Sequence, residues 1–552
     1  MTHAPSSDPT SNKRNVVLYR NGSVYTAADP FATAMLVDDG TVAWVGSEQA
    51  ASSIADDSME IIDLRGALVA PGFVDSHLHL TETGIALDSL QLGAVRSAGQ
   101  LLDAVASSTS QGPVLGHGWD ESTWDDPALP SADELERAAG GRPVYLSRVD
   151  VHSALVSSSL AASAGLAGLD GFSAGSQVKR AAHTAARQST RRLPDDALRA
   201  YQKRALGNAA ENGYVAVVEM AGPHIGGLSD LRIAASWNLG HDDGAVPEVL
   251  PYWGSLVGSE EHAREVLNGL GVSVQGLAGD LNIDGSIGSR TAALRSDYDD
   301  SRGERGTLYL SVEEAAAHLA ACSLLGVQGG FHVIGDAGLD AALDALDLAA
   351  AEVGDQRIRA AGHRFEHVEM ADARAVERLA HYSITVSAQP GFDAAWGAAG
   401  GLYEQRLGSR SRAMNPFASF YSAGVPICFG SDSPVTPLLP WSSVRACLEH
   451  NNQEERISAR AAFLGHTRAG WRAAKYPNPM AGQLVPGSPA SFAVWDAEEL
   501  MVQVADGRVQ SWSTDPRART PLLPALDTGR DPVCLQTVRD GEELFASPAL
   551  RS

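Results

Sequence analysis

The sequence lacks the marks of a disulfide-stabilised or membrane-spanning protein. Only 4 of its 552 residues are cysteines, and none of them have C-x-x-C spacing, so we expect reduced thiols and no cysteine metal site. No apolar run reaches the length of about 18 residues that a membrane helix needs. Residues 1–14 are polar and lack the apolar core of a secretion signal, which predicts a disordered tail on a cytoplasmic protein.

Basic residues are also scarce. The chain has 42 Lys and Arg against 67 Asp and Glu, a formal net charge of -25. Such a balance argues against a surface that binds the phosphate backbone of nucleic acids. We interpret the acidity as a solvated surface, and we expect a small-molecule partner, not a nucleic acid or a membrane.

Strand-like and helix-like segments are distributed unevenly along the chain. Residues 15–70 and 485–548 contain short β-rich runs between turn signals. Residues 71–484 instead alternate strand and helix patterns, which is typical of βαβ units and a parallel sheet. The sequence therefore predicts an α/β fold: a TIM-like (β/α)₈ barrel over 71–484, with a substrate-side insertion around 88–165, and a small composite β-sandwich domain from both chain ends.

An apolar stretch, residues 70–80, ends in two histidines separated by one residue. If residues 73–79 form a strand, His77 and His79 point to the same face, because side chains alternate along a strand. Two imidazoles on one face supply half of a site for zinc or a related ion. The alternative is that two histidines happen to share a strand face.

Other metal-ligand residue types recur where predicted strands end. A barrel carries its functional residues at these C-terminal ends. The positions are Asp280 or Asp284 around a predicted strand at 281–285, His332, His367 and Asp432. Nitrogen and oxygen ligands of this mixture suit Zn²⁺, Mn²⁺ or Fe²⁺.

Taken together, these segments resemble the amidohydrolase superfamily, and most closely its YtcJ-like branch, which includes N-substituted formamide deformylase. The resemblance is carried by residues 70–80, by Asp-Gly-Ser-Ile-Gly-Ser-Arg-Thr-Ala at 284–292, and by the motifs around His332, His367 and Asp432. Gly-His-Gly-Trp-Asp-Glu at residues 116–121 also resembles a signature of that branch.

The resemblance implies a metal-dependent hydrolase in which an activated water attacks a C–N bond of an amide or formamide-type small molecule. It assigns His77 and His79 with Asp432 to a first metal, and His332 and His367 to a second. It also makes Asp432 the general base, which takes a proton from the water and passes it to the leaving nitrogen. Zinc, one or two ions per chain, is expected, with Mn²⁺ or Fe²⁺ as alternatives. A homodimer is the expectation from the family.

One position departs from the family pattern. Many relatives carry a carboxylated lysine, which bridges two metals, four residues before the Asp-Gly of this loop, whereas this chain has Asp280. Asp280 bridges two metals after a small backbone shift, or the site holds one metal, or Asp280 is only a strand-end carboxylate. We predict that it is a ligand.

Five further residues are predicted to contact substrate. Trp119 and Asp120 belong to the Gly-His-Gly-Trp-Asp-Glu segment, where a turn fixed by a buried tryptophan is the alternative. His152 lies in a segment that resembles one near the substrate in the family. Ser289 and Arg290 could hold a substrate oxygen or carboxylate, since arginine offers two parallel donors; a structural clamp within the loop is the alternative.

Two other functions remain open from the sequence. One is an aminohydrolase (deaminase) or cyclic-amide hydrolase of the same fold with a mononuclear site. The other is a non-catalytic relative that binds a ligand, against which the retained histidines and Asp432 argue.

Overall fold

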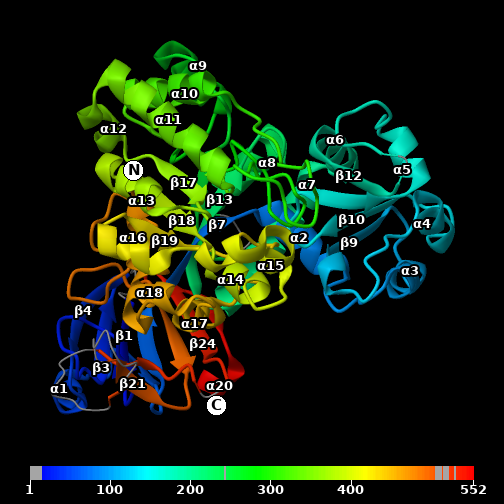
Figure 1. Cartoon of the computed structure of the whole chain (residues 1–552). Coiled ribbons are helices and arrows are strands. Elements are labelled where there is room, and N and C mark those ends of the chain that lie inside the picture. The colour runs from blue at the N-terminus through cyan, green and yellow to red at the C-terminus, as the bar shows by residue number, and fades with distance from the viewer. Residues whose placement is uncertain are drawn as a thin grey trace, which may run out of the picture. The chain divides into compact units, whose positions relative to one another are not determined.

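A computed structural model describes residues 15–173, 175–240, 244–503, 512–513, 521–527 and 530–551 (Figure 1). The tail predicted for residues 1–14 lies outside the described residues. Backbone contacts divide the chain into two compact units, Met1–Gly72 with Met480–Ser552, and Phe73–Pro479.

The first unit consists mainly of β-strands. They are β1 (Val16–Arg20), β2 (Ser23–Val24), β3 (Ala34–Asp38), β4 (Thr41–Gly46), β5 (Glu60–Asp63), β6 (Leu68–Pro71), β20 (Phe492–Asp496), β21 (Leu500–Gln503), β22 (Trp512–Ser513), β23 (Leu523–Pro524), β24 (Val533–Arg539) and β25 (Glu542–Ala546), with helices α1 (Glu48–Ile54) and α20 (Pro548–Arg551). The sheets have the orders β4-β3-β1-β5, β2-β6-β20-β24-β25 and β22-β21-β23. In the second of these, β20 pairs with β6, so strands from both chain ends are hydrogen-bonded in one sheet.

Apolar side chains of these strands form one core. Tyr19 meets Phe492 edge to face, with ring centroids 5.1 Å apart, and Met35, Val69 and Val494 are buried around them. Burial of alternate side chains from sheets that both chain ends supply therefore stabilises this unit.

The second unit contains eight strands that pair in parallel. They are β7 (Phe73–Leu78), β13 (Tyr214–Ala221), β14 (Glu248–Trp253), β15 (Gly276–Leu277), β16 (Gln328–Val333), β17 (Arg364–His367), β18 (Thr385–Ala388) and β19 (Ile427–Phe429). Their orders are β14-β13-β7 and β15-β16-β17-β18-β19. The amide of Asp432 donates to the carbonyl of His77 at 2.7 Å, which joins the end of β19 to β7. The arrangement is TIM-like, and it brings the C-terminal ends of several strands to one place.

Helices follow most of these strands and cover them on the outside, as the green and yellow ribbons in Figure 1 show. They are α2 (Leu80–Asp88), α7 (Asp195–Glu211), α8 (Gly227–Ser236), α9 (Glu260–Leu270), α10 (Val312–Leu325), α11 (Asp336–Val353), α12 (Asp355–Ala361), α13 (Ala373–Tyr382), α14 (Pro390–Trp396), α15 (Leu402–Leu407), α16 (Phe417–Ala423), α17 (Pro440–Glu449), α18 (Ala459–Gly465) and α19 (Arg468–Ala473). Ser311 and Glu314 form a capping box at the start of α10, which satisfies amides that the first turn leaves free.

A smaller sheet is inserted after α2. Its elements are β8 (Leu90–Gln91), α3 (Ala98–Ala106), β9 (Val114–Trp119), α4 (Ala132–Ala138), β10 (Val144–Arg148), β11 (Ser153–Val156), α5 (Ser158–Ser163), β12 (Gln177–Lys179) and α6 (Arg180–Thr190). The strand order is β12-β11-β10-β9-β8. The insertion extends beyond its predicted end at residue 165, because β12 and α6 also belong to it. Helix α6 supplies one wall of the cavity described below.

The strand predicted at residues 281–285 is not formed. The neighbouring strand is β15, and beyond it one isolated bridge joins Asn282 to His332. Gly279 has a φ of +91°, which turns the chain out of the extended conformation. The Asp284 carboxylate then accepts the amides of Ala293, Ile334 and Gly335. These contacts make the segment a loop, although its apolar residues are buried.

Among the described helices, none is long and apolar enough to cross a membrane. All four cysteines of the chain, Cys322, Cys428, Cys447 and Cys534, are buried free thiols.

Candidate metal centre

Side chains from the ends of four strands meet at one point of the second unit. Among the described residues, two groups could hold a metal ion: His77, His79 and Asp280, and His77, His367 and Asp432, with the ligand atoms of each group within 4.8 Å of one another. His77 and His367 lie at the ends of β7 and β17, while His79, Asp432 and Asp280 follow β7, β19 and β15.

The separations between these atoms suit direct coordination. Nε2 of His77 lies 3.5 Å from Asp280 Oδ1 and 3.4 Å from Asp432 Oδ1. Nε2 of His79 lies 3.2 Å from Asp280 Oδ2 and 3.4 Å from Asp432 Oδ1. Ligands bound at about 2.0–2.2 Å around a tetrahedral ion are roughly 3.3–3.5 Å apart. The shorter side chain of aspartate therefore reaches the two histidines without the lysine of the family that the sequence resembles.

The same side chains carry buried polar atoms without hydrogen-bond partners. These atoms are His77 Nε2, His79 Nδ1, Asp280 Oδ1, His332 Nδ1, His367 Nε2 and Asp432 Oδ1. A buried polar atom without a partner costs free energy, so native proteins nearly always satisfy such atoms. Three of these atoms come together, because His77 Nε2 lies within 3.5 Å of both Asp280 Oδ1 and Asp432 Oδ1, and such a cluster of unpartnered atoms fits a divalent cation.

The electrostatics at His77 lead to the same conclusion. Burial alone would lower its pKa, but Asp432, Glu366 and Asp280 outweigh burial and raise the pKa to about 10. Two opposing effects also act on Asp280. Burial would raise its pKa, but His79 and His77 outweigh burial and hold the pKa well below the usual value. The cluster thus favours positive charge at a point where a metal ion would supply it.

A buried carboxylate orients His77. Nδ1 of His77 donates to Glu366 Oε2 at 2.8 Å, and Arg364 holds Glu366 through hydrogen bonds of 2.6 and 2.9 Å. Burial would raise the pKa of Glu366, but Arg364 and His77 lower it to about 2. Because the proton of the ring is held on Nδ1, the lone pair of Nε2 faces the other ligands.

An amide plays the corresponding part for His367. Nδ1 of His367 donates to Gln389 Oε1 at 2.7 Å, which leaves Nε2 directed toward His77 and Asp432. His367 and Asp432 have φ values of 71° and 54°. Residues other than glycine seldom adopt this left-handed conformation, and where they do, the strain often lies at a functional site.

His332 lies beside the cluster, with its ring centroid 4.4 Å from that of His367. It belongs to neither metal-compatible group in the described part of the chain. Asp284, the alternative to Asp280, is occupied by the backbone amides named above. Of the two aspartates, only Asp280 is thus placed at the centre.

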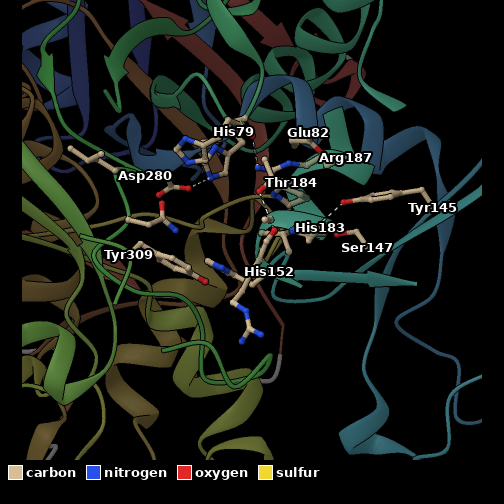
Figure 2. A pocket seen from close by; sticks show the side chains of 18 residues that line it. His79, Glu82, Tyr145, Ser147, His152, His183, Thr184, Arg187, Asp280 and Tyr309 are labelled. Carbon is tan, nitrogen blue, oxygen red and sulfur yellow. Dashed lines mark hydrogen bonds and ion pairs between the residues drawn. The ribbon is translucent and has the colours of Figure 1, made fainter. Parts of the chain in front are cut away.

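A cavity of about 410 Å³ opens beside the centre (Figure 2). His79 and Asp280 line one side, and the polar face of α6 lines another. His152 lies between the cavity and the cluster, since its ring centroid is 5.1 Å from that of His332. Tyr145, Val151, Ile225, Leu281, Tyr309 and Pro434 contribute apolar surface. Such a volume and such a mixture of surfaces are usual for sites that bind small molecules.

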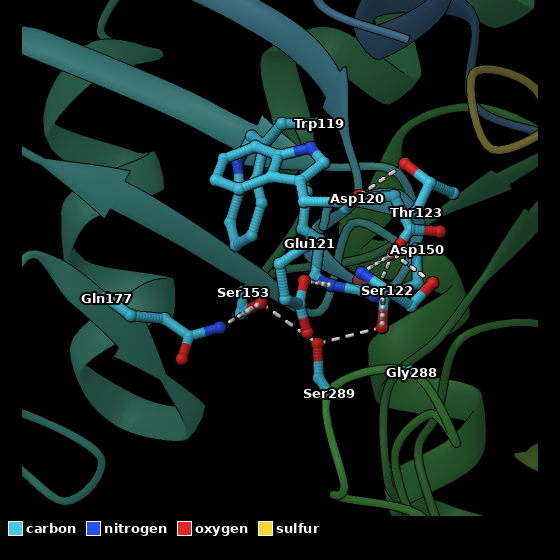
Figure 3. A network of polar contacts seen from close by, with 12 residues as sticks. Trp119, Asp120, Glu121, Ser122, Thr123, Asp150, Ser153, Gln177, Gly288 and Ser289 are labelled. Carbon is cyan, nitrogen blue, oxygen red and sulfur yellow. Dashed lines mark hydrogen bonds and ion pairs between the residues drawn. The ribbon is translucent and has the colours of Figure 1, made fainter. Parts of the chain in front are cut away.

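Trp119 and Asp120 lie away from this cavity. Trp119 is fully buried in the insertion, and its Nε1 donates to the carbonyl of Leu146 at 2.8 Å. Asp120 accepts from Arg148 at 2.6 Å, and Glu121 also binds Arg148, at 2.9 Å. Figure 3 shows this network. The Trp-Asp-Glu segment is a buried turn held by a salt-bridge cluster.

Ser289 and Arg290 make structural contacts. Ser289 donates to Asp150 Oδ2 at 2.8 Å and lies 2.9 Å from the hydroxyl of Ser153 (Figure 3). Arg290 binds Asp300 through two hydrogen bonds of 3.0 and 2.6 Å. Of the five predicted substrate contacts, His152 is thus the one that lines the cavity. Of the other four, Ser289 joins the loop at 284–292 to the insertion, whereas the contacts of Trp119 and Asp120 lie within the insertion and Arg290 pairs with Asp300.

Sequence reasoning missed several residues that shape this site. Glu366 and Gln389 were not predicted to orient the ligand histidines, because their partners are remote in sequence. The sequence does contain one pattern that could have predicted the α6 wall of the cavity. Polar residues recur there at the i, i+3, i+4, i+7 spacing of one helix face: Arg180, His183, Thr184 and Arg187.

Comparison with known proteins decides the family. The model of the Amidohydrolase family matches residues 60–545. The chain belongs to the amidohydrolase family. This confirms the resemblance on which the prediction of a metal-dependent hydrolase of carbon–nitrogen bonds rested.

Individual relatives agree with this membership. The chain is 26% identical over 88% of its length to the putative amidohydrolase YtcJ of Bacillus subtilis, of which the match covers 96%. It is 22% identical over 78% of its length to N-substituted formamide deformylase of Arthrobacter pascens, with 83% of that enzyme covered. A crystal structure of an uncharacterized metal-dependent hydrolase from Pyrococcus furiosus superposes with a TM-score of 0.67 at 25% identity, covering 87% of this chain and 98% of the other. This amidohydrolase is therefore similar to the YtcJ-like branch.

Proposed function

We propose that this amidohydrolase hydrolyses the C–N bond of a linear amide or formamide at a metal centre built on His77, His79, Asp280 and Asp432. The observation that carries the proposal is the convergence of these four side chains, each with an unpartnered buried atom, beside a cavity of about 410 Å³. The similarity to N-substituted formamide deformylase supports a formamide-type substrate.

We infer that one metal ion is sufficient. The two metal-compatible groups share His77, and His77 has one free ring nitrogen because Glu366 occupies the other. One nitrogen lone pair binds one ion. The two groups are therefore alternative sets of ligands for one ion that binds His77. We propose zinc, since nitrogen and oxygen ligands at tetrahedral spacing suit it, and manganese or iron are the alternative metals. The alternative to a single ion is a second ion bound by His332 and His367.

Asp432 is proposed as the general base. Burial would raise the pKa of its carboxyl, but His77 and His79 hold it well below the usual value, so it is ionised at neutral pH. A bound divalent ion supplies polarisation of the substrate oxygen and a lowered pKa for water. Asp432 accepts the proton that the attacking water loses and returns it to the nitrogen as the C–N bond breaks and the C–O bond forms. We propose that His152, which lines the cavity, contacts the substrate, and that Ser289 fixes the loop that carries Asp150 through its hydrogen bond to Asp150 Oδ2. Trp119, Asp120 and Arg290 stabilise their own segments through Leu146, Arg148 and Asp300.

We also propose the finer features of the fold. Parallel pairing in two sheets supports closure of the eight strands into a barrel, together with the backbone hydrogen bonds from the Asp432 amide to the His77 carbonyl and from the His79 amide to the Ser433 carbonyl. The pairing of β20 with β6 supports a composite domain from both chain ends. The cytoplasmic location and the homodimer stay predictions from the sequence.

The test combines product analysis with one variant. The purified enzyme is assayed with N-benzylformamide and N-benzylacetamide, measuring amine, carboxylate and ammonia, and its metal is measured by elemental analysis. We expect released amine plus carboxylate, about one metal per chain, and a loss of about 10²–10⁴-fold in kcat for Asp432→Asn. Ammonia released from amino-substituted heterocycles, without amide hydrolysis, would favour the aminohydrolase alternative instead. Unchanged turnover in Asp432→Asn would remove the proposed base.

A further inference from the structure

The wall of the cavity that faces the metal centre carries an arginine that forms no ion pair with any described carboxylate, although it acts on Glu82 at longer range. Arg187 projects from α6, and its Nη2 donates to the carbonyl of His224 at 2.9 Å. Its Nε is buried and has no hydrogen-bond partner. Among the residues that the structure describes, no carboxylate forms an ion pair with Arg187.

The other charges of the cavity wall are already neutralised. Arg191 binds Glu82 through two hydrogen bonds of 2.8 Å, and Arg180 lies 2.8 Å from Asp170. Asp280 belongs to the metal centre. Arg187 is thus the excess positive charge of this wall.

We propose that the substrate carries an anionic group, a carboxylate, that Arg187 binds while the scissile amide lies at the metal centre. The inference rests on the proposed function, and it narrows the substrate to amides that carry a carboxylate. A guanidinium offers parallel N–H donors that match a carboxylate, and hydrogen bonds between charged groups are about twice as strong as neutral ones. Arg187 lines the cavity, and apart from the bond from Nη2 to the His224 carbonyl its guanidinium has no acceptor among the described residues, so a carboxylate in the cavity supplies one.

The geometry of the wall agrees with this assignment. Thr184 and Arg187 lie three residues apart on one face of α6, and Figure 2 shows both among the side chains that surround the cavity with His79 and Asp280. Tyr145 and Tyr309 provide apolar surface for the part of the molecule between the carboxylate and the amide. Hydrolysis of such an amide consumes one water and yields a carboxylic acid and an amine, one of which retains the anionic group.

The test uses N-formyl derivatives of glycine, β-alanine and γ-aminobutyrate, each compared with its neutral carboxamide. The series varies the distance between the amide and the carboxylate, so it locates Arg187 relative to the centre. We expect wild-type kcat/KM to favour at least one carboxylate over its carboxamide by about tenfold or more. Arg187→Gln should raise KM for that carboxylate by about 10–100-fold and change KM for the carboxamide much less, whereas Arg187→Lys should keep part of the preference.

Control variants and a binding measurement separate the outcomes. Arg264→Gln removes an exposed arginine that pairs with Glu260, and it controls for the change in net charge. Calorimetric titration of the same compounds into Asp432→Asn measures binding without turnover. Arg187-dependent binding of carboxylates without wild-type hydrolysis would support the anion site and contradict the proposed function. Equal hydrolysis of carboxylates and carboxamides by the wild type, an equal effect of Arg187→Gln on both, or no binding of any carboxylate, would overturn the anion site.

Discussion

Nδ1 of His77 donates a hydrogen bond of 2.8 Å to Glu366, and so a carboxylate fixes the orientation of the ring that both metal-compatible groups share. We expect Glu366→Gln to weaken metal binding by about 10–100-fold, because the neutral amide no longer raises the basicity of the ring and leaves Arg364 without its counter-charge. Titration of the chelator-treated protein with zinc measures the affinity. Glu313→Gln, at an exposed position of α10, is the matched control. An unchanged zinc affinity in Glu366→Gln would contradict the proposed site.

Asp280 should behave as a ligand although it replaces a lysine. Its two oxygens lie 3.5 Å from His77 Nε2 and 3.2 Å from His79 Nε2. We expect Asp280→Ala to lose most of its metal during purification, and Asp280→Asn to retain more, since the amide oxygen is a weaker ligand. Elemental analysis of the folded variants gives the metal content, and circular dichroism checks the fold. Full metal content in Asp280→Ala would mean that Asp280 is only a strand-end carboxylate.

Arg148 should be a large contributor to stability. It is fully buried and contacts three carboxylates, those of Asp120, Glu121 and Asp150. Arg148→Met removes the cation that Asp120 and Asp150 pair with, while Glu121 keeps Arg406 at 2.7 Å, and we expect a loss of roughly 3–5 kcal/mol in the free energy of unfolding. The matched control is Arg290→Met, which breaks a partly exposed pair with Asp300 and should cost about 1 kcal/mol or less. Denaturant unfolding of both variants measures the difference, and equal losses would argue against a buried cluster.

Glu82 should make stability depend on acid pH. Burial would raise the pKa of Glu82, but Arg191 lowers it from 4.5 to about 2. A carboxyl with a depressed folded-state pKa stabilises the protein above its unfolded pKa, and this stabilisation is lost as the pH falls from about 4.5 toward 2. We expect Glu82→Gln to destabilise the protein by at most about 3 kcal/mol at pH 7, and the gap to wild type to shrink as the pH falls below 4.5. Thermal unfolding from pH 7 to 3.5 tests this; a constant gap would show that the charge of Glu82 is not responsible.

The candidate ligands could be predicted from the sequence because each follows an apolar strand. In a parallel arrangement, strand ends such as those at His77, His367 and Asp432 meet in space. The partners of these ligands could not be predicted in this way. Glu366 is next to His367 in sequence but orients His77, a choice that depends on how β7 and β17 lie relative to one another.

Other differences have local causes. The segment at 281–285 has the composition of a strand, but the positive φ of Gly279 and the backbone amides bound by Asp284 make it a loop. Polar residues recur on α6 at helical spacing, a pattern typical of a helix face exposed to solvent. Only the tertiary structure shows that this face lines the cavity beside the metal centre. Trp119 lies in a short polar motif, yet its ring is buried, because it packs in the apolar core of the insertion with Val114 and Leu146.

The buried free cysteines give each unit its own chemical reporter. Cys322, Cys428 and Cys447 belong to the unit at residues 73–479, and Cys534 belongs to the other. A thiol reagent reaches such a group only when the surrounding structure opens, so the modification rate measures local opening. Mass spectrometry of the protein during slow alkylation would therefore resolve whether the two units open together or in sequence, without any engineered label.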